Sequence, residues 1–202
     1  MGETIIVDYN VGNICSVENA LRRLGATYCL SGDPARILSA DHVILPGVGN
    51  AAEAMRRLRG KGLVEVIKAV KAPLLGICVG MQLMCNSSQE GNTACMGLFD
   101  VEVKRFPDGL KGEDGSRLKI PHMGWSRVAS LKSPLFEGLE EGSYLYFVHS
   151  YYAEESPLAA AKTEYGVTIS SALWRDNFFG TQFHPEKSGD AGARILKNFL
   201  DL

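Results

Sequence analysis

The stretch that decides the fold sets a cysteine between two glycines, where an apolar run gives way to a helical pattern: Leu74-Leu75-Gly76-Ile77-Cys78-Val79-Gly80-Met81-Gln82. The run before Cys78 predicts a buried strand, and the residues after it predict a helix. Glycines two positions before and after a nucleophile are typical of a sharp strand-to-helix turn, because they avoid side-chain collisions. The turn would hold the sulfur at a helix N-terminus, which favours the thiolate. Taken alone, the pattern fits a buried structural cysteine beside two turn glycines equally well.

On the N-terminal side of this stretch, short apolar runs alternate with amphipathic patterns. The expected strands cover residues 4–8, 28–31, 42–45 and 74–77. The expected helices cover residues 13–24, 51–69 and 81–85, the second being interrupted near Gly60 and Gly62. We expect Asn13 to cap the first helix and Gly25 to end it. Strands that alternate with helices predict a parallel sheet with helices on both faces.

Beyond about residue 97 the pattern changes to strand-like runs separated by polar turns. The expected elements are strands at 101–103 and 144–148, a hairpin formed by 167–173 and 178–183, and a final helix at 189–200. Residues 107–117 are rich in Gly, Asp and Lys and predict an exposed excursion. Because no repeat or linker interrupts the chain, the prediction is one α/β domain over residues 1–202. Its mostly parallel central sheet would have antiparallel additions in the C-terminal half.

The composition excludes several classes of protein. The chain has 202 residues, 46% hydrophobic and 22% charged, with a net charge of −2. These values are typical of a globular protein and argue against a dedicated nucleic-acid binder, which carries a basic excess. No apolar run reaches the ~18 residues of a membrane span, and the N-terminus does not resemble a signal peptide. We therefore expect a cytoplasmic protein without membrane contacts.

Five cysteines, at an odd count and without a C-x-x-C pair, argue against a disulfide framework or a zinc ribbon. Cys78 is the one whose neighbourhood suggests chemistry. We expect the other four to be buried and inert: Cys15, Cys29, Cys85 and Cys95.

A second candidate group lies late in the chain, in Gln182-Phe183-His184-Pro185-Glu186. Residues two apart on an extended segment project to the same side, so Glu186 can bond one ring nitrogen of His184. The other nitrogen can then face Cys78. This arrangement would form a Cys–His–Glu triad, which suits nucleophilic acyl chemistry. A histidine in an apolar strand is otherwise more often a packed core residue.

The stretch Pro46-Gly47-Val48-Gly49 ends the strand expected at 42–45. A turn flanked by glycines at the carboxyl edge of a sheet can aim backbone N–H groups at a developing oxyanion. We expect the N–H groups of Val48 and Val79 to act together in this way. Gly47 and Gly49 tolerate the positive φ angles that rotation of the Val48 peptide needs. The plainer interpretation is a turn that only ends the strand.

These residues resemble the class I (triad) glutamine amidotransferases, through residues 76–82 and 184–186. Within that class the chain is most similar to the glutaminase subunits of imidazole glycerol phosphate synthase. The closer similarity rests on four further stretches, which are Asp8-Tyr9-Asn10-Val11-Gly12-Asn13, Pro46-Gly47-Val48-Gly49, Pro121-His122-Met123-Gly124-Trp125 and Tyr146-Phe147-Val148-His149-Ser150-Tyr151. Together the matches span the whole chain.

The resemblance implies a role for each matching residue. Cys78 would attack the side-chain amide of glutamine, His184 would transfer the proton, and Glu186 would orient His184. The oxyanion hole would be formed by Val79, Val48, Gly47 and Gly49. The glutamine would be bound by Gln82, Ser150 and Tyr151. No cofactor and no metal ion are implied.

The resemblance also implies a partner, a cyclase subunit with a (β/α)₈ barrel that forms a heterodimer with this chain. Ammonia would pass through a channel to the cyclase, which makes imidazole glycerol phosphate and aminoimidazole carboxamide ribotide in histidine biosynthesis. The positions that match the channel entrance are Asn13, Trp125, Tyr144 and Lys187. Trp125 could equally be a core aromatic. One departure is Ser126, where the family usually has Asn. The change leaves open whether a hydrogen bond near the interface is kept.

Three other interpretations remain to be weighed. A paralogous amidotransferase subunit that feeds a different synthase stays open. A binding module without catalysis would need a broken triad, and all three triad residues are present. A cysteine peptidase or stress protein on a related sheet would have no reason to carry Gln82 or the 184–186 spacing.

Overall fold

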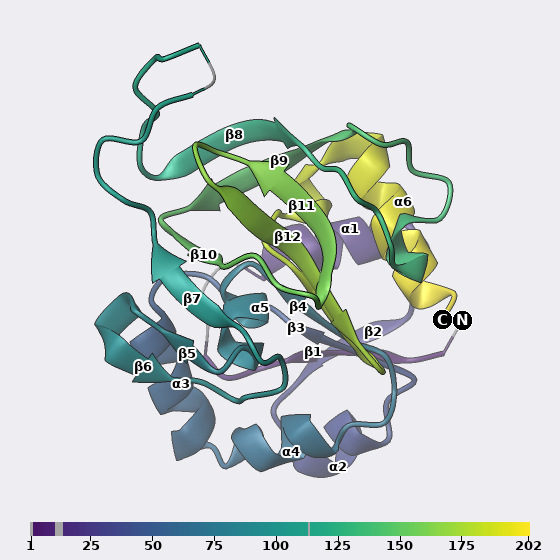
Figure 1. Cartoon of the computed structure of the whole chain (residues 1–202). Coiled ribbons are helices and arrows are strands. Elements are labelled where there is room, and N and C mark those ends of the chain that lie inside the picture. Colours follow the sequence, from purple (N-terminus) through teal and green to yellow (C-terminus); the bar gives the residue numbers. More distant parts are fainter. Residues whose placement is uncertain (1, 11–13, 113) are drawn as a thin grey trace.

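The computed structural model describes residues 2–10, 14–112 and 114–202, and within them a seven-stranded sheet forms the centre of the molecule (Figure 1). The strand order is β11-β12-β13-β4-β3-β1-β2. The parallel strands are β1 (Thr4–Val7), β2 (Tyr28–Ser31), β3 (His42–Leu45), β4 (Leu74–Ile77) and β13 (Phe178–Thr181). The antiparallel additions are β11 (Ala159–Glu164) and β12 (Thr168–Arg175). The predicted α/β fold with a mostly parallel sheet is confirmed.

Helices cover both faces of this sheet, as the alternating pattern predicted. Figure 1 shows α1 (Cys15–Arg23) and α6 (Gly189–Leu200) on one side, and α2 (Pro34–Leu38), α3 (Ala51–Gly60) and α4 (Leu63–Ala69) on the other. The interruption expected within 51–69 falls at Gly62, whose φ of +67° separates α3 from α4. Gly25, with φ +69°, ends α1 as expected, whereas the predicted cap Asn13 lies outside the described residues. None of the described helices is long and apolar enough to cross a membrane.

Two smaller sheets lie beside the central one. One pairs β8 (His122–Arg127) with β9 (Tyr144–His149) in an antiparallel ribbon. The other has the order β10-β7-β5-β6, formed by Tyr151–Ala153, Glu102–Arg105, Ser87–Ser88 and Thr93–Ala94. The remaining elements are α5 (Val79–Met84) and the short 3₁₀ turns η1 (Glu90–Asn92), η2 (Pro134–Phe136) and η3 (Pro185–Lys187). The strands expected at 101–103 and 144–148 correspond to β7 and β9.

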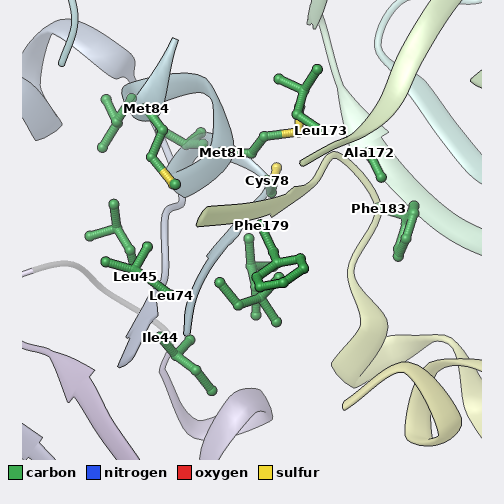
Figure 2. Close-up of a cluster of buried hydrophobic side chains, with 14 of the residues drawn as sticks. Ile44, Leu45, Leu74, Cys78, Met81, Met84, Ala172, Leu173, Phe179 and Phe183 are labelled. Atoms are coloured by element: carbon green, nitrogen blue, oxygen red, sulfur yellow. The ribbon is translucent and has the colours of Figure 1, made fainter. Parts of the chain in front are cut away.

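The core surrounds the central strands. Every residue of β1, β3 and β4 is buried, which is usual for parallel strands covered on both faces. Figure 2 shows part of this cluster, in which Cys78 lies among buried apolar side chains that include Leu74, Met81 and Phe179. Close packing of this kind holds the residue after β4 in a fixed position.

The parallel strands bring their carboxyl ends to one edge of the sheet. Gly76 of β4 is in register with Leu45 of β3 and with Gly180 of β13. The residues that follow these three strands are therefore neighbours in space, although they lie far apart in the sequence. Ligands bind at such an edge in open α/β sheets.

The four other cysteines differ in their environments. Cys85 is buried, and burial raises the pKa of its thiol. Cys95 is partly buried, and burial raises its pKa to about 11. Cys29 is also partly buried, but Cys15 is exposed at the first turn of α1. The expectation that all four are buried is therefore confirmed for Cys85 alone. Cys29 and Cys95 are only partly buried, and Cys15 is exposed because it falls on the solvent face of an amphipathic helix.

Candidate active site

Cys78 stands at the sharp turn between β4 and α5. Its backbone has φ 54° and ψ −111°, which a non-glycine residue adopts only when its surroundings impose it. The Cys78 N–H donates to the Thr181 carbonyl at 2.7 Å and ties the turn to β13. A Cβ at Gly76 would stand 2.8 Å from the Met81 nitrogen, and one at Gly80 would stand 2.0 Å from the Leu45 oxygen. Both glycines are needed for this close approach, as the sequence predicted.

His184 and Glu186 form the second part of the site. Nδ1 of His184 lies 2.8 Å from Oε1 of Glu186, and both side chains are only 4% exposed. Burial alone would lower the pKa of His184, but the Cys78 thiol and the Glu186 carboxylate outweigh it and raise that pKa to about 9. Nε2 of His184 is buried and has no hydrogen-bond partner within the described ranges, although Cys78 is close enough to affect its pKa. Catalytic hydrogen bonds are often long before substrate binds.

A cavity of about 330 Å³ opens where these groups meet. Cys78 and His184 line it, together with the predicted substrate residues Gln82, Ser150 and Tyr151. The structure thus brings together segments that are distant in the sequence. The volume suits a small metabolite rather than a polymer.

Gln82 is held by two hydrogen bonds to other residues of the chain. Its Nε2 donates to the Tyr151 carbonyl and to Oε1 of Gln182, both at 2.9 Å. A side-chain amide has two N–H donors, so Oε1 is the atom left for a ligand. Gln82 therefore offers an acceptor to the cavity.

Two residues of this site were not assigned a role from the sequence. Nε2 of Gln182 donates to Sγ of Cys78 at 3.7 Å and can stabilise a thiolate. Its position two residues before His184 is a signal that alternation along the strand could have revealed. Glu90 lines the cavity from η1, and its Oε2 accepts a hydrogen bond from the Ala51 N–H at 2.7 Å. No local pattern marks Glu90, because only the fold brings it to the cavity.

The turn after β3 lies beside the Cys78 turn. Val48 and Gly49 line the cavity, and the Tyr9 hydroxyl donates to the Pro46 carbonyl at 2.6 Å. Gly49 has φ +86°, in keeping with the expected conformational freedom. Gly47 has a different reason to be glycine, since a Cβ there would stand 2.1 Å from the Gly80 nitrogen. Close approach of two turns, rather than positive φ, requires glycine at this position.

The residues expected at a partner interface lie in two places. Trp125 and Tyr144 are 53% and 51% exposed on the adjacent strands β8 and β9. The alternative that Trp125 belongs to the core is therefore wrong. Lys187 is exposed at the cavity and directly follows the triad residue Glu186 on η3. Asn13 lies outside the described residues.

Comparisons with known proteins identify the family of the chain. The model of the class-I glutamine amidotransferase family matches residues 5–202. The imidazole glycerol phosphate synthase subunit HisH of Bacteroides fragilis (strain YCH46) is 50% identical over 197 residues, which cover 98% of both chains. The same subunit of Yersinia pestis is 45% identical over 202 residues, covering 99% of this chain and 100% of that one.

Solved structures agree on the fold. A putative GMP synthase protein from Thermoplasma acidophilum has a TM-score of 0.75 at 22% identity, covering 100% of this chain and 93% of that one. PurLQS from Thermotoga maritima has a TM-score of 0.71 at 18% identity, covering 100% and 99%. At such identities the likeness concerns the fold alone, whereas the family rests on the match over residues 5–202 and on the relatives at 45% and 50% identity. The chain belongs to the class-I glutamine amidotransferases and, within them, to the HisH subunits of imidazole glycerol phosphate synthase.

Proposed function

We propose that this chain is the glutaminase subunit of an imidazole glycerol phosphate synthase and hydrolyses glutamine to glutamate and ammonia. One observation carries the proposal, which is that the strained Cys78 turn and the buried His184–Glu186 pair open onto the same cavity. A nucleophile, a base and a residue that orients the base are the parts that acyl transfer needs. We propose that residues 1–202 form a single glutamine amidotransferase domain.

The reaction proceeds through a thioester. His184 Nε2 takes the Cys78 proton, and the sulfur attacks the side-chain amide carbon of glutamine. His184 then gives this proton to the departing nitrogen, so ammonia leaves and a γ-glutamyl thioester remains. Water, deprotonated by the same Nε2, attacks the thioester and releases glutamate and the thiol. Glu186 keeps Nδ1 protonated and stabilises the positive ring that forms in each half of the cycle.

The oxyanion and the amino-acid end of glutamine meet different parts of the cavity. The N–H groups of Val79 and Val48 stabilise the tetrahedral oxyanion. Oε1 of Gln82 and the Glu90 carboxylate are acceptors suited to the α-ammonium group. The backbone of Ser150 and Tyr151 binds the other side of the amino-acid end. The cavity of about 330 Å³ lies within the usual range for a small ligand such as glutamine.

The ammonia passes to a cyclase subunit with a (β/α)₈ barrel, in a cytoplasmic heterodimer that serves histidine biosynthesis. Trp125, Tyr144 and Lys187 face this partner, with Asn13 as the fourth contact. Large exposed aromatic side chains on one ribbon are typical of an interface, because Trp and Tyr are enriched among residues that dominate binding. Transfer inside the complex protects ammonia from protonation in water.

Replacement of the nucleophile tests the proposal. The variant Cys78→Ala, mixed with the barrel cyclase and its substrate, should form no glutamate from glutamine. The same mixture should still make imidazole glycerol phosphate when an ammonium salt is added, because only the ammonia source is lost. Glutamate formation at the wild-type rate would overturn the proposal, and loss of the ammonium-dependent reaction would show that Cys78 supports assembly instead.

A further inference from the structure

Two buried histidines connect the cavity with the exposed strand β8, and the mechanism above uses neither of them. His122 begins β8 and is 1% exposed, and His149 ends β9 and is 6% exposed. The two residues are in register across the ribbon, and Nδ1 of His122 lies 3.0 Å from Nε2 of His149. Buried imidazoles need hydrogen-bond partners, so each contact of this pair has a defined direction.

The Tyr151 carbonyl, at one end of the histidine pair, determines which ring nitrogens donate and which accept. Nδ1 of His149 lies 2.8 Å from the Tyr151 carbonyl, which can only accept, so Nδ1 carries the proton. Nε2 of His149 must then accept from Nδ1–H of His122. Nε2 of His122 in turn accepts from the Ser126 hydroxyl at 2.7 Å. These hydrogen bonds form a series that runs from Ser126 through His122 and His149 to the Tyr151 carbonyl. The series has one consistent arrangement of donors and acceptors, in which both rings are neutral.

The environment favours these neutral rings. Burial lowers the pKa of His122 to about 4. Burial, followed by the effect of His122, lowers the pKa of His149 to about 3. Both rings are also held in place, because His122 stacks against Phe147 and Tyr165, with centroids 4.8 and 3.8 Å apart, and Phe106 lies 5.3 Å from His149. The hydrogen bonds therefore have little freedom to rearrange at neutral pH.

The series continues past the Tyr151 carbonyl to the nucleophile. This carbonyl also accepts from Nε2 of Gln82 at 2.9 Å, and Gln82 in turn donates to Gln182, which contacts Sγ of Cys78. The carbonyl thus has two donors, one from the histidine pair and one from the residue that faces the cavity. Its position sets the orientation of the Gln82 amide and of the backbone at residues 150–151.

We propose that Ser126, His122 and His149 are positioning residues for glutamine, because they fix the Tyr151 carbonyl and thereby the Gln82 acceptor. The inference rests on the proposed function, since Gln82 and residues 150–151 are there assigned to the amino-acid end of glutamine. That end is distant from the amide that reacts. Loss of the series should therefore raise KM for glutamine and leave kcat essentially unchanged.

Ser126 provides the cleanest test, because it is half-buried on a surface strand and its replacement leaves the core intact. The variant Ser126→Ala removes the donor to His122. It should raise KM by about 3–10-fold, because the free energy of one neutral hydrogen bond corresponds to a factor of this size. Ser126→Thr restores a hydroxyl and should restore KM. The control is Ser143→Ala, because the Ser143 hydroxyl donates to the Glu140 carbonyl, just before β9 and outside the series. Steady-state glutaminase assays of the full chain with the barrel cyclase give both constants.

The histidine itself gives a second comparison. His149→Asn keeps a donor near the position of Nδ1, whereas His149→Leu removes it, so the Leu variant should have the higher KM. Equal KM values for wild type, Ser126→Ala and Ser126→Thr would overturn the inference. A fall in kcat of Ser126→Ala at constant KM would also overturn it, because that result indicates loss of folded enzyme. If the wild-type complex itself forms no glutamate, the proposed function fails instead, so the two failures are distinguishable.

Discussion

At the residue scale, the backbone of Cys78 combines strain with function. Its positive φ costs a non-glycine residue on the order of 1–3 kcal/mol. We expect Cys78→Gly to be more stable than Cys78→Ala by about 1 kcal/mol, since glycine relieves the strain but loses more entropy on folding. Chemical denaturation of the two variants measures this difference. A less stable Gly variant would mean that the turn is not strained.

The reactivity of the five cysteines gives a second test. A glutamine analogue with an electrophile in place of the amide should label Cys78 alone, because it needs the cavity. Iodoacetamide has no such requirement and should also label Cys15, which is exposed. Peptide masses after digestion identify the modified residue. Equal labelling of Cys85 or Cys95 by the analogue would contradict the assignment of the nucleophile.

The two other triad residues should differ in their contributions. His184→Ala removes the group that transfers the proton, and general acid–base catalysis is worth about 10²–10⁴-fold. Glu186→Ala leaves the imidazole in place and removes only its orientation and charge stabilisation, so it should cost less in kcat. A larger loss for Glu186→Ala than for His184→Ala would show that the assigned roles are wrong.

The buried histidine pair also affects stability. The pKa values of His122 and His149 are lowered to about 4 and about 3, below the 6.5 of the unfolded chain. Between pH 6.5 and 4 the unfolded chain therefore binds more protons, and the free energy of unfolding falls as the pH falls. Each histidine contributes a slope of about 1.4 kcal/mol per pH unit. Urea denaturation at several pH values should show a shallower slope for His149→Asn than for wild type, and an unchanged slope would refute the pair's neutrality.

At the scale of elements, the turn after β3 contains Gly49, whose φ of +86° favours glycine. The chain alone should hydrolyse glutamine slowly if the Val48 peptide turns its carbonyl to the cavity, because one oxyanion donor is worth about 10²–10³-fold. Partner plus cyclase ligand should then raise kcat by that order. Gly49→Ala, at φ +86°, should reduce this activation more than it changes glutamine binding. Gly47→Ala is a poorer test, because its Cβ would stand 2.1 Å from the Gly80 nitrogen and would disturb the Cys78 turn itself.

If the free chain hydrolyses glutamine as fast as the liganded complex, the turn does not change its conformation and is a static part of the site. Steady-state glutaminase kinetics of the free chain, the complex and the liganded complex separate these cases.

The elements that the sequence predicted best are those with uniform local patterns. β2, β3, β4 and α6 have the bounds that we expected. Buried apolar runs mark β3 and β4, and an amphipathic stripe marks α6, without any partner. β2 has no buried residue, and its short apolar run alone predicted it. β11 was missed because Ala159, Ala160 and Ala161 have a low intrinsic preference for strands, and pairing with β12 overrides it. β8 was missed because its alternation of buried and exposed residues begins with a histidine, which no hydropathy pattern marks as buried.

The candidate site divides in the same way. Cys78 and His184–Glu186 occur in local motifs that the sequence displays directly. Glu90 and the His122–His149 pair reach the site only through contacts between distant segments. One sequence without structure contains no signal for such contacts.

At the scale of the whole molecule, the exposed ribbon of β8 and β9 predicts where the partner binds. Trp125→Ala should weaken association with the barrel cyclase by about 2 kcal/mol or more if Trp125 is a dominant contact. The stability of the isolated chain should change little, because the side chain is 53% exposed. Titration calorimetry measures the first quantity and thermal unfolding the second. An unchanged dissociation constant would place the interface elsewhere.

The production of ammonia from glutamine for a cyclase can be followed in one coupled assay. Glutamine and the cyclase substrate are supplied to the chain with and without the barrel partner, and glutamate and imidazole glycerol phosphate are both measured. We expect both products to form at equal rates in the complex and glutamate to form much more slowly without the partner. Glutamate formation without imidazole glycerol phosphate in the complex, or no glutamate at all, would contradict the proposed function.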